Sequence, residues 1–166
     1  MQMLFSHRFF HCFFIVFFVV KYRIFCAWSA RRSFLCQGGK EYDEKSAVCL
    51  YTGFCNFEFS AILETLKMDG WELVYIGKTI EPVRCEEGFL AIPERCWKDV
   101  NACEYEALLL TGVGAEGDEA DWLMVDEDLR QLIRDFDNQK KLIAAISCAP
   151  MCLIGAGILQ ERKVLA

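Results

Sequence analysis

The chain has 166 residues, 10 cysteines and a formal net charge of −6 at pH 7, and its length suits one domain of ordinary size. The charge is divided unevenly, because residues 1–40 hold six of the 18 basic residues and none of the 24 acidic ones. Residues 41–166 therefore carry 12 basic against 24 acidic groups. An acidic segment of this kind has no basic surface for phosphate backbones, which argues against binding to nucleic acids.

Residues 1–45 form an apolar, basic leader that we predict to lie apart from the folded domain. Nine of the 14 Phe residues lie in it, and its apolar run 9–20 is shorter than the roughly 20 residues that a helix needs to cross a bilayer. Three interpretations remain open: a signal peptide or membrane anchor that begins after Arg8, sequence that is not native to the protein, or a structural role. We expect contact with a membrane only if the leader is native.

The domain begins with a strand, a helix and a second strand. Residues 46–51 are an apolar run that ends at a turn, and residues 71–76 form a second such run. Between the two runs, apolar residues recur with the spacing of an amphipathic helix, which Gly70 ends: Phe59, Ile62, Leu63 and Leu66. Two strands joined by one helix make a βαβ unit, so the sequence predicts a parallel sheet.

The middle of the chain continues the sheet after an irregular insertion. Short pieces within 82–93 predict a small hairpin, and 107–111 predicts a third parallel strand. Four acidic residues and no Lys follow in the glycine-containing loop that begins at Gly112, so we expect no nucleotide site there. Asp126 can cap the next helix, whose buried stripe is Leu129, Leu132, Ile133 and Phe136.

A fourth strand, 142–146, passes through Ser147 and Cys148 into a helix that begins at Pro150. A residue at such a turn projects above the carboxyl edge of a parallel sheet beside free helix amides, where nucleophiles are often found. Tight packing of small residues is the alternative explanation. Residues 164–166 start another strand, so we expect a domain that is incomplete at its C-terminus, exposes apolar surface and associates with itself.

The cysteines do not predict a metal site or a disulfide framework. The sequence has no C-x-x-C pair, and the two cysteines that stand four apart, Cys148 and Cys152, have no His nearby. We therefore expect no metal and no cofactor. Reduced thiols in a cytoplasmic protein are the expected state.

Three stretches, 50–59, 107–114 and 141–157, together resemble the ThiJ/PfpI family, which includes the Parkinsonism-associated deglycases within the class I glutamine amidotransferase-like superfamily. The resemblance covers residues 46–166. It implies a flavodoxin-like three-layer α/β sandwich with a mainly parallel sheet, a homo-oligomer such as a dimer, and a small-molecule ligand. It also implies a nucleophilic Cys at the strand-to-helix turn, hydrogen-bonded to a Glu from the first helix.

The family's site can be carried over residue by residue. The helix Glu corresponds to Glu58, and a register anchored on Ile146 and Pro150 puts Ser147 in the nucleophile position with Cys148 one place later. We expect Ser147 to adopt a strained turn conformation and point toward Glu58, while Cys148 turns toward the neighbouring loop or a partner subunit. The resemblance further implies an oxyanion or pocket role for Gly112, Val113 and Ala149.

Two functions follow from these residues. The displaced Cys, and the absence of any His from residues 41–166, favour a weakly active or non-catalytic relative that senses redox state. The alternative is a hydrolase or a glyoxalase/deglycase-like enzyme. It would act on small carbonyl or thioester compounds through Cys148 or Ser147, assisted by Glu58.

Overall fold

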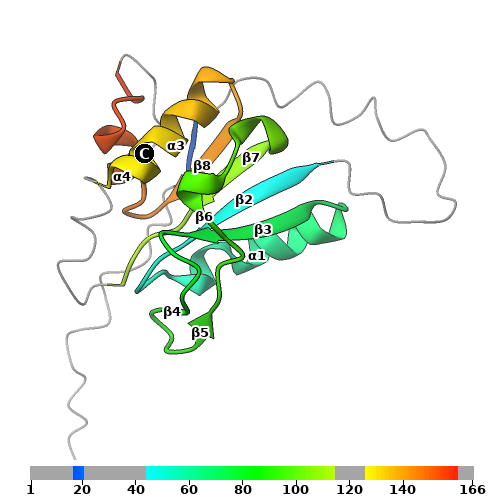
Figure 1. The fold of residues 1–166 in the computed structure, drawn as a ribbon. Coiled ribbons are helices and arrows are strands. Elements are labelled where there is room, and N and C mark those ends of the chain that lie inside the picture. Colours follow the sequence, from blue (N-terminus) through cyan, green and yellow to red (C-terminus); the bar gives the residue numbers. More distant parts are fainter. Residues whose placement is uncertain (1–16, 21–43, 115–125, 161–166) are drawn as a thin grey trace, which may run out of the picture.

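The computed structural model describes residues 17–20, 44–114 and 126–160, in which strands and helices alternate (Figure 1). The strands are β1 (Phe17–Val20), β2 (Lys45–Leu50), β3 (Glu72–Gly77), β4 (Val83–Arg84), β5 (Leu90–Ala91), β6 (Arg95–Cys96), β7 (Ala107–Leu110) and β8 (Leu142–Ile146). The helices are α1 (Asn56–Met68), α3 (Glu127–Asn138) and α4 (Pro150–Gly155), with the 3₁₀ turns η1 (Trp97–Asp99) and η2 (Ala102–Glu104).

A mainly parallel sheet organises the domain. Its strand order is β1-β8-β7-β2-β3-β6, and every pair of neighbours except β1 and β8 runs parallel. In the centre, Ala47 pairs with Val74 of β3 and with Leu108 of β7. The four strands predicted from apolar runs are therefore confirmed as parallel neighbours. Their runs lack polar alternation because both faces of the sheet are covered.

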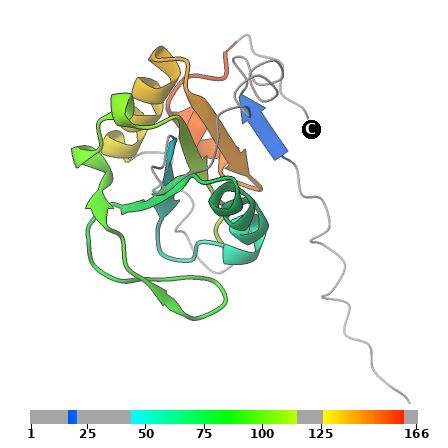
Figure 2. The same cartoon turned by 90° about the vertical axis from the view of Figure 1, so that its right-hand side faces the viewer.

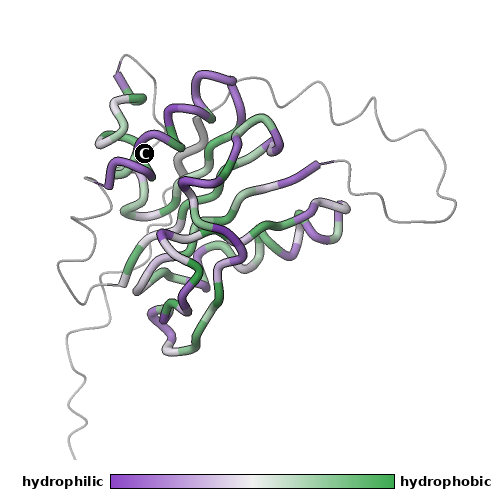
Figure 3. Tube along the Cα trace, viewed as in Figure 1, coloured by the Kyte–Doolittle hydropathy of each residue, from purple (hydrophilic) through white to green (hydrophobic). Residues whose placement is uncertain are grey.

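Helices cover the two faces of this sheet and make three layers (Figure 2). α1 packs near β3, and α3 packs against β7, β8 and α4. Within α1, Phe59 and Leu63 are buried, and the buried residues of α3 are the predicted stripe of Leu129, Leu132, Ile133 and Phe136. Hydrophobic residues run along the central strands, as Figure 3 shows. The predicted α/β fold of the flavodoxin-like type is thus confirmed.

A short part of the leader, β1, lies at one edge of the sheet and corrects our prediction that the leader stays apart. Phe17–Val20 pairs antiparallel with β8, with Phe17 opposite Ile146 and Val20 opposite Ile143. Without a neighbour, this side of β8 would leave its amides and carbonyls unpaired, and aromatic and β-branched residues favour an extended backbone. Lack of polar alternation therefore did not keep these four residues out of the sheet.

At the opposite edge, β3 is only partly covered by a strand. β6 pairs with Ile76 and Gly77 alone. One residue further back, the Tyr75 amide donates to Glu94 Oε1 at 3.0 Å, and the Glu94 amide donates to the Tyr75 carbonyl at 2.7 Å. The side chain and the backbone of Glu94 thus supply the hydrogen bonds that Tyr75 would otherwise lack at this edge of the sheet.

The predicted hairpin between the second and third central strands is confirmed as β4 and β5. The two strands pair antiparallel, with Val83 opposite Ala91 and Arg84 opposite Leu90. Its base lies beside the turn after β2, because the Gly53 amide donates to the Arg84 carbonyl at 2.7 Å. The hairpin is therefore held against the end of the sheet at which the strand-to-helix turns lie.

All three described α-helices end in the same way, with a left-handed residue just past the last turn. That residue is Gly70 after α1 and Gly157 after α4, but Lys140, with φ of 57°, after α3. At α3 the Lys140 amide donates to the Asp137 carbonyl and the Lys141 amide to the Phe136 carbonyl, both at 2.9 Å. This is the Schellman arrangement, which favours glycine at the left-handed position.

Some expectations concern residues outside the described part of the chain. These are the strand at 164–166, the acidic stretch 116–121 and most of the leader. Among the helices that the structure does describe, none has the length and apolar character needed to cross a membrane.

Candidate functional site

The turn between β8 and α4 has the strained geometry predicted for it. Ser147 follows the last residue of β8 and has a φ of 58°, a left-handed conformation that residues other than glycine adopt rarely. The Ala149 amide donates to the Ile146 carbonyl at 3.0 Å and closes the turn, and Pro150 begins α4. The Ser147 side chain is exposed, whereas Cys148 is half-buried.

Glu58 lies near this turn because it occupies the first turn of α1, at the carboxyl edge of the sheet. Its Oε2 accepts hydrogen bonds from the Gly112 amide at 2.7 Å and from Thr111 Oγ1 at 3.0 Å. Thr111 Oγ1 also lies 2.8 Å from the Cys55 carbonyl, so its single proton has two candidate acceptors. The carboxylate is therefore fixed by the end of the neighbouring strand.

Gly112 separates Glu58 from Ser147. A methyl group on its Cα would lie 2.8 Å from Glu58 Oε2, 2.9 Å from Ser147 Cβ and 3.0 Å from Ser147 Oγ. The carboxylate and the hydroxyl thus border one small space, and only a residue without a side chain leaves that space open. The Ser147 and Glu58 side chains therefore both border Gly112, and no hydrogen bond joins the two among the described residues.

Cys148 turns instead toward the loop that follows β7. The Val113 amide points at Cys148 Sγ, with an N–Sγ distance of 3.3 Å. Val113 is itself held by a β-bridge to Phe54, in the turn after β2. The Cys148 sulfur thus lies against the loop, which is one of the two directions expected for it.

The three amides carried over as oxyanion or pocket groups all have partners inside the chain. The Gly112 amide donates to Glu58, the Val113 amide to the Cys148 sulfur, and the Ala149 amide to the Ile146 carbonyl. An oxyanion hole stabilises a developing negative charge only with donors aimed at the reacting oxygen. In this structure all three N–H groups already donate to atoms of the chain, so none of them is available to a substrate oxygen.

The N-terminus of α1 has partners that the sequence reasoning missed. Cys55, the residue before the helix, donates its thiol to Glu86 Oε2 at 2.7 Å. Glu87 accepts from the Phe57 amide at 2.8 Å and from the Asn56 amide at 3.3 Å. Slight burial raises the pKa of Glu87, but these amide hydrogen bonds outweigh it and lower the pKa overall. The hairpin turn thus caps the helix that carries Glu58.

The DJ-1/PfpI family model matches residues 44–166, which is most of the chain. The chain belongs to the DJ-1/PfpI family. The match begins two residues before the start expected for the domain.

Among curated proteins, this DJ-1/PfpI chain is similar to Protein/nucleic acid deglycase 2 of Escherichia coli (strain K12), at 30% identity over 74% of the chain and 70% of that protein. It is also similar to glutathione-independent glyoxalase DJR-1.2 of Caenorhabditis elegans, at 27% identity over 72% of the chain and 63% of that protein. The chain therefore spans just under two thirds of the length of the second relative.

A solved two-domain protein from Anabaena variabilis, with DJ-1/ThiJ/PfpI-like and ferritin-like domains, superposes with a TM-score of 0.66. It is 22% identical to the chain, and the match covers 73% of the chain and 34% of that protein. At this identity the likeness shows the fold alone. It places the chain's strands and helices in the DJ-1/PfpI arrangement.

Beneath the turn of this DJ-1/PfpI domain, three thiols gather around Tyr51. Burial, followed by the charge of Cys148, raises the pKa of Cys152 to about 12. Burial and the charge of Cys152 raise the pKa of Cys49 further. The Tyr51 hydroxyl donates to the Thr111 carbonyl, and burial and then these thiols raise its pKa. No group of His, Cys, Asp and Glu suited to a metal ion occurs among the described residues.

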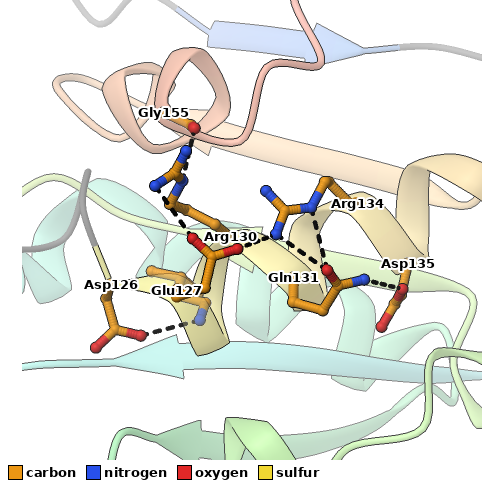
Figure 4. A network of polar contacts seen from close by, with 8 residues as sticks. Asp126, Glu127, Arg130, Gln131, Arg134, Asp135 and Gly155 are labelled. Atoms are coloured by element: carbon orange, nitrogen blue, oxygen red, sulfur yellow. Dashed lines mark hydrogen bonds and ion pairs between the residues drawn. The ribbon is translucent and has the colours of Figure 1, made fainter.

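The far end of α4 is anchored by the neighbouring helix (Figure 4). Arg130 of α3 donates through Nε to the Gly155 carbonyl at 2.7 Å and pairs with Glu127 at 3.1 Å. Arg134 pairs with the same Glu127 and lies against Gln131. A cation at a helix C-terminus is favourable, so α3 fixes the short helix that follows Cys148.

Proposed function

We propose that the chain is a weakly active or non-catalytic member of the DJ-1/PfpI family whose Cys148 thiol senses redox state. The observation that carries the proposal is the position of the two turn residues. Ser147 occupies the place beside Glu58, while the Cys148 sulfur lies against the Val113 amide. No hydrogen bond joins this thiol to Glu58 among the described residues, and each group binds a different amide of the loop after β7.

Weak catalysis follows from the chemistry of Ser147. A serine hydroxyl becomes a good nucleophile only with a hydrogen-bonded general base. The only histidines of the chain are His7 and His11, so residues 41–166 supply no imidazole. The Glu58 Oε2 atom already accepts two hydrogen bonds, and the three candidate oxyanion amides have internal partners. Acyl transfer would have to break these contacts first.

A sensing role is supported by the surroundings of Cys148. Its side chain is half-buried, so part of the residue is open to small solutes. The Val113 N–H group points at the sulfur, so the thiol lies against the loop after β7. Access of the oxidant to the sulfur is one of the factors that decide which cysteines oxidise.

The alternative is a cysteine-dependent enzyme that acts on small carbonyl or thioester compounds. It is supported by the names of the two curated relatives, a deglycase and a glyoxalase. In that case Cys148 would be the nucleophile, and Glu58 would have to exchange Gly112 for the sulfur as its partner.

We also propose a reducing, cytoplasmic location and self-association. Seven cysteines in the described part of the chain are free thiols, as expected in a reducing compartment. Large apolar side chains are exposed on α1 and the hairpin, among them Phe57 at 58% and Leu90 at 56%. Sedimentation of the purified protein at several concentrations tests the self-association, and a monomer at every concentration would contradict it.

Alkylation kinetics near neutral pH test the proposed function. We compare four proteins, which are the natural one and Ser147→Cys, each with and without Cys148→Ala. These four and Glu58→Ala are assayed for glyoxalase activity on a small dicarbonyl compound. We expect little glyoxalase activity from the natural protein and rapid alkylation of a cysteine introduced at position 147. Efficient turnover by the natural protein that is lost in both Cys148→Ala and Glu58→Ala would support the enzymatic alternative instead.

A further inference from the structure

Cys148 and Cys152 lie four residues apart where the turn after β8 enters α4, and the function proposed above uses only the first of them. The Met151 amide donates to the Cys148 carbonyl at 3.0 Å, and the Cys152 amide to the Ala149 carbonyl at 2.9 Å, so the intervening backbone is wound into a turn. A backbone wound with about the helical rise of 1.5 Å per residue separates such residues by roughly 6 Å, which lies within the Cα separation of about 4.4–6.8 Å that a disulfide requires.

The two thiols differ in access. Cys148 is half-buried at the turn, whereas Cys152 is 3% exposed and packs inward toward Cys49 and Tyr51. The two sulfurs are close enough for the charge of Cys148 to affect Cys152. A solute therefore meets Cys148 first, and Cys152 is held behind it, out of contact with solvent.

We propose that Cys152 is the resolving thiol for Cys148, and that oxidation by a peroxide converts the pair to an intramolecular disulfide across the first turn of α4. This inference rests on the proposed redox function. It adds a second reactive residue and a defined product to that function.

The reaction balances in two steps. The Cys148 sulfur attacks the O–O bond of the peroxide; an S–O bond forms, and the other oxygen leaves as water or an alcohol with the thiol proton. The Cys152 sulfur then attacks Cys148, the S–S bond forms, and the hydroxyl of the sulfenic acid leaves as water with the Cys152 proton. Two thiols are oxidised by two electrons, and one peroxide is reduced.

The local structure provides the movement that the bond needs. Side chains four apart on a helix have Cβ atoms about 5–6 Å apart, more than the roughly 3.5–4.5 Å of a disulfide. Cys148 precedes the first helical residue, Pro150, and follows the left-handed Ser147, so its backbone lies outside the helix and its side chain is not limited to the rotamers that a helix allows. Closing the bond draws the Cys148 sulfur away from the Val113 amide.

Burial also sets the order of events. Because burial and the charge of Cys148 raise the pKa of Cys152 to about 12, Cys152 stays a protonated thiol that peroxide attacks slowly. The first step therefore belongs to Cys148, the more exposed of the two thiols, and Cys152 reacts in the second.

A peptide experiment tests the inference. Trypsin cuts after Lys141 and Arg162, and the peptide between them contains Cys148 and Cys152 and no other cysteine. The reduced full-length chain is treated with one equivalent of hydrogen peroxide, blocked with N-ethylmaleimide, digested and analysed by mass spectrometry. Parallel samples contain dimedone, which traps sulfenic acid. Trapping is needed because oxidation of Met151 adds the same single oxygen.

We expect the natural peptide to lose two hydrogen atoms, to resist N-ethylmaleimide and to recover after reduction. In Cys152→Ser and in Cys152→Ala, dimedone labelling of Cys148 should rise at least about fivefold, because the sulfenic acid is no longer consumed. Cys49→Ala is the matched control, since it removes the other buried thiol of the cluster and should leave the disulfide yield unchanged.

Two results would overturn the inference, and they separate it from the proposed function. If Cys148 forms sulfenic or sulfinic acid to the same extent with and without Cys152, and no disulfide appears, the resolving role is wrong but redox sensing by Cys148 stands. If peroxide leaves Cys148 unmodified while exposed Cys103 reacts, the proposed redox function fails as well.

Discussion

Gly112→Ala tests the geometry of the site most directly. The φ of Gly112 lies outside the left-handed region, so the backbone accepts alanine, and any penalty comes from contacts of the new methyl group. That group would lie 2.8 Å from Glu58 Oε2 and 2.9 Å from Ser147 Cβ. Ser147 Cβ is attached to a strained turn and cannot rotate away, so we expect a loss of about 1–3 kcal/mol in the free energy of unfolding.

Gly114→Ala provides the matched control two residues further along the same loop. Its methyl group would lie 2.8 Å from Glu86 Cγ, on an exposed side chain that can move aside only by giving up its hydrogen bond with the Cys55 thiol. We expect a smaller loss than in Gly112→Ala, about 0.5–1.5 kcal/mol, the value of one hydrogen bond. Urea unfolding followed by circular dichroism measures both variants against the natural protein. Equal stability of the two variants, or a Gly112→Ala protein as stable as the natural one, would refute the placement of Glu58 and Ser147 around Gly112.

Three further predictions concern the supports of the site. Glu87→Gln should lower the free energy of unfolding by about 0.3–1 kcal/mol at pH 7. The folded state lowers the pKa of Glu87, so the carboxylate stabilises the fold above its unfolded pKa and loses this effect as the pH falls. Thermal melts near pH 3 should therefore show no difference between the variant and the natural protein. Lys140→Gly should raise the free energy of unfolding by about 1 kcal/mol, because glycine adopts the left-handed backbone of residue 140 without strain. The urea midpoint should rise accordingly, and an unchanged midpoint would contradict the prediction. Thr111→Val should cost about 1–2 kcal/mol in the same assay by deleting the hydroxyl between Glu58 and Cys55; no loss would contradict that contact.

The sheet could be predicted because its information is local. Apolar runs such as 107–111 and the stripe of α3 report burial directly, and Asp126 does accept from the Leu129 amide at 3.0 Å as a helix cap. The strand-to-helix turn could also be predicted, because a few small residues between a buried strand and Pro150 are typical of a tight turn. The approach of Ser147 to Glu58 was implied only through the family register.

The contacts that hold the site in place could not be predicted, because they join residues far apart in the sequence. Glu86 and Glu87 look like an ordinary polar turn, yet they bind Cys55 and the amides of α1 across about 30 residues. The sequence predicts Thr111 only as the last residue of a strand, whereas in the structure its hydroxyl lies between the Cys55 carbonyl and Glu58 Oε2. No periodic pattern marks such pairs. The antiparallel placement of β1 was missed for the same reason.

The partner of Tyr75 has a consequence for how copies of the chain meet. An open strand edge is a template onto which another molecule can add its own strand, and this is a common start of aggregation. Here the Tyr75 amide and carbonyl are both taken by Glu94, which also places a carboxylate where an incoming strand would have to lie. A second copy would displace that carboxylate and leave its charge without the amide. Growth of the sheet from one molecule into the next is therefore disfavoured at Tyr75.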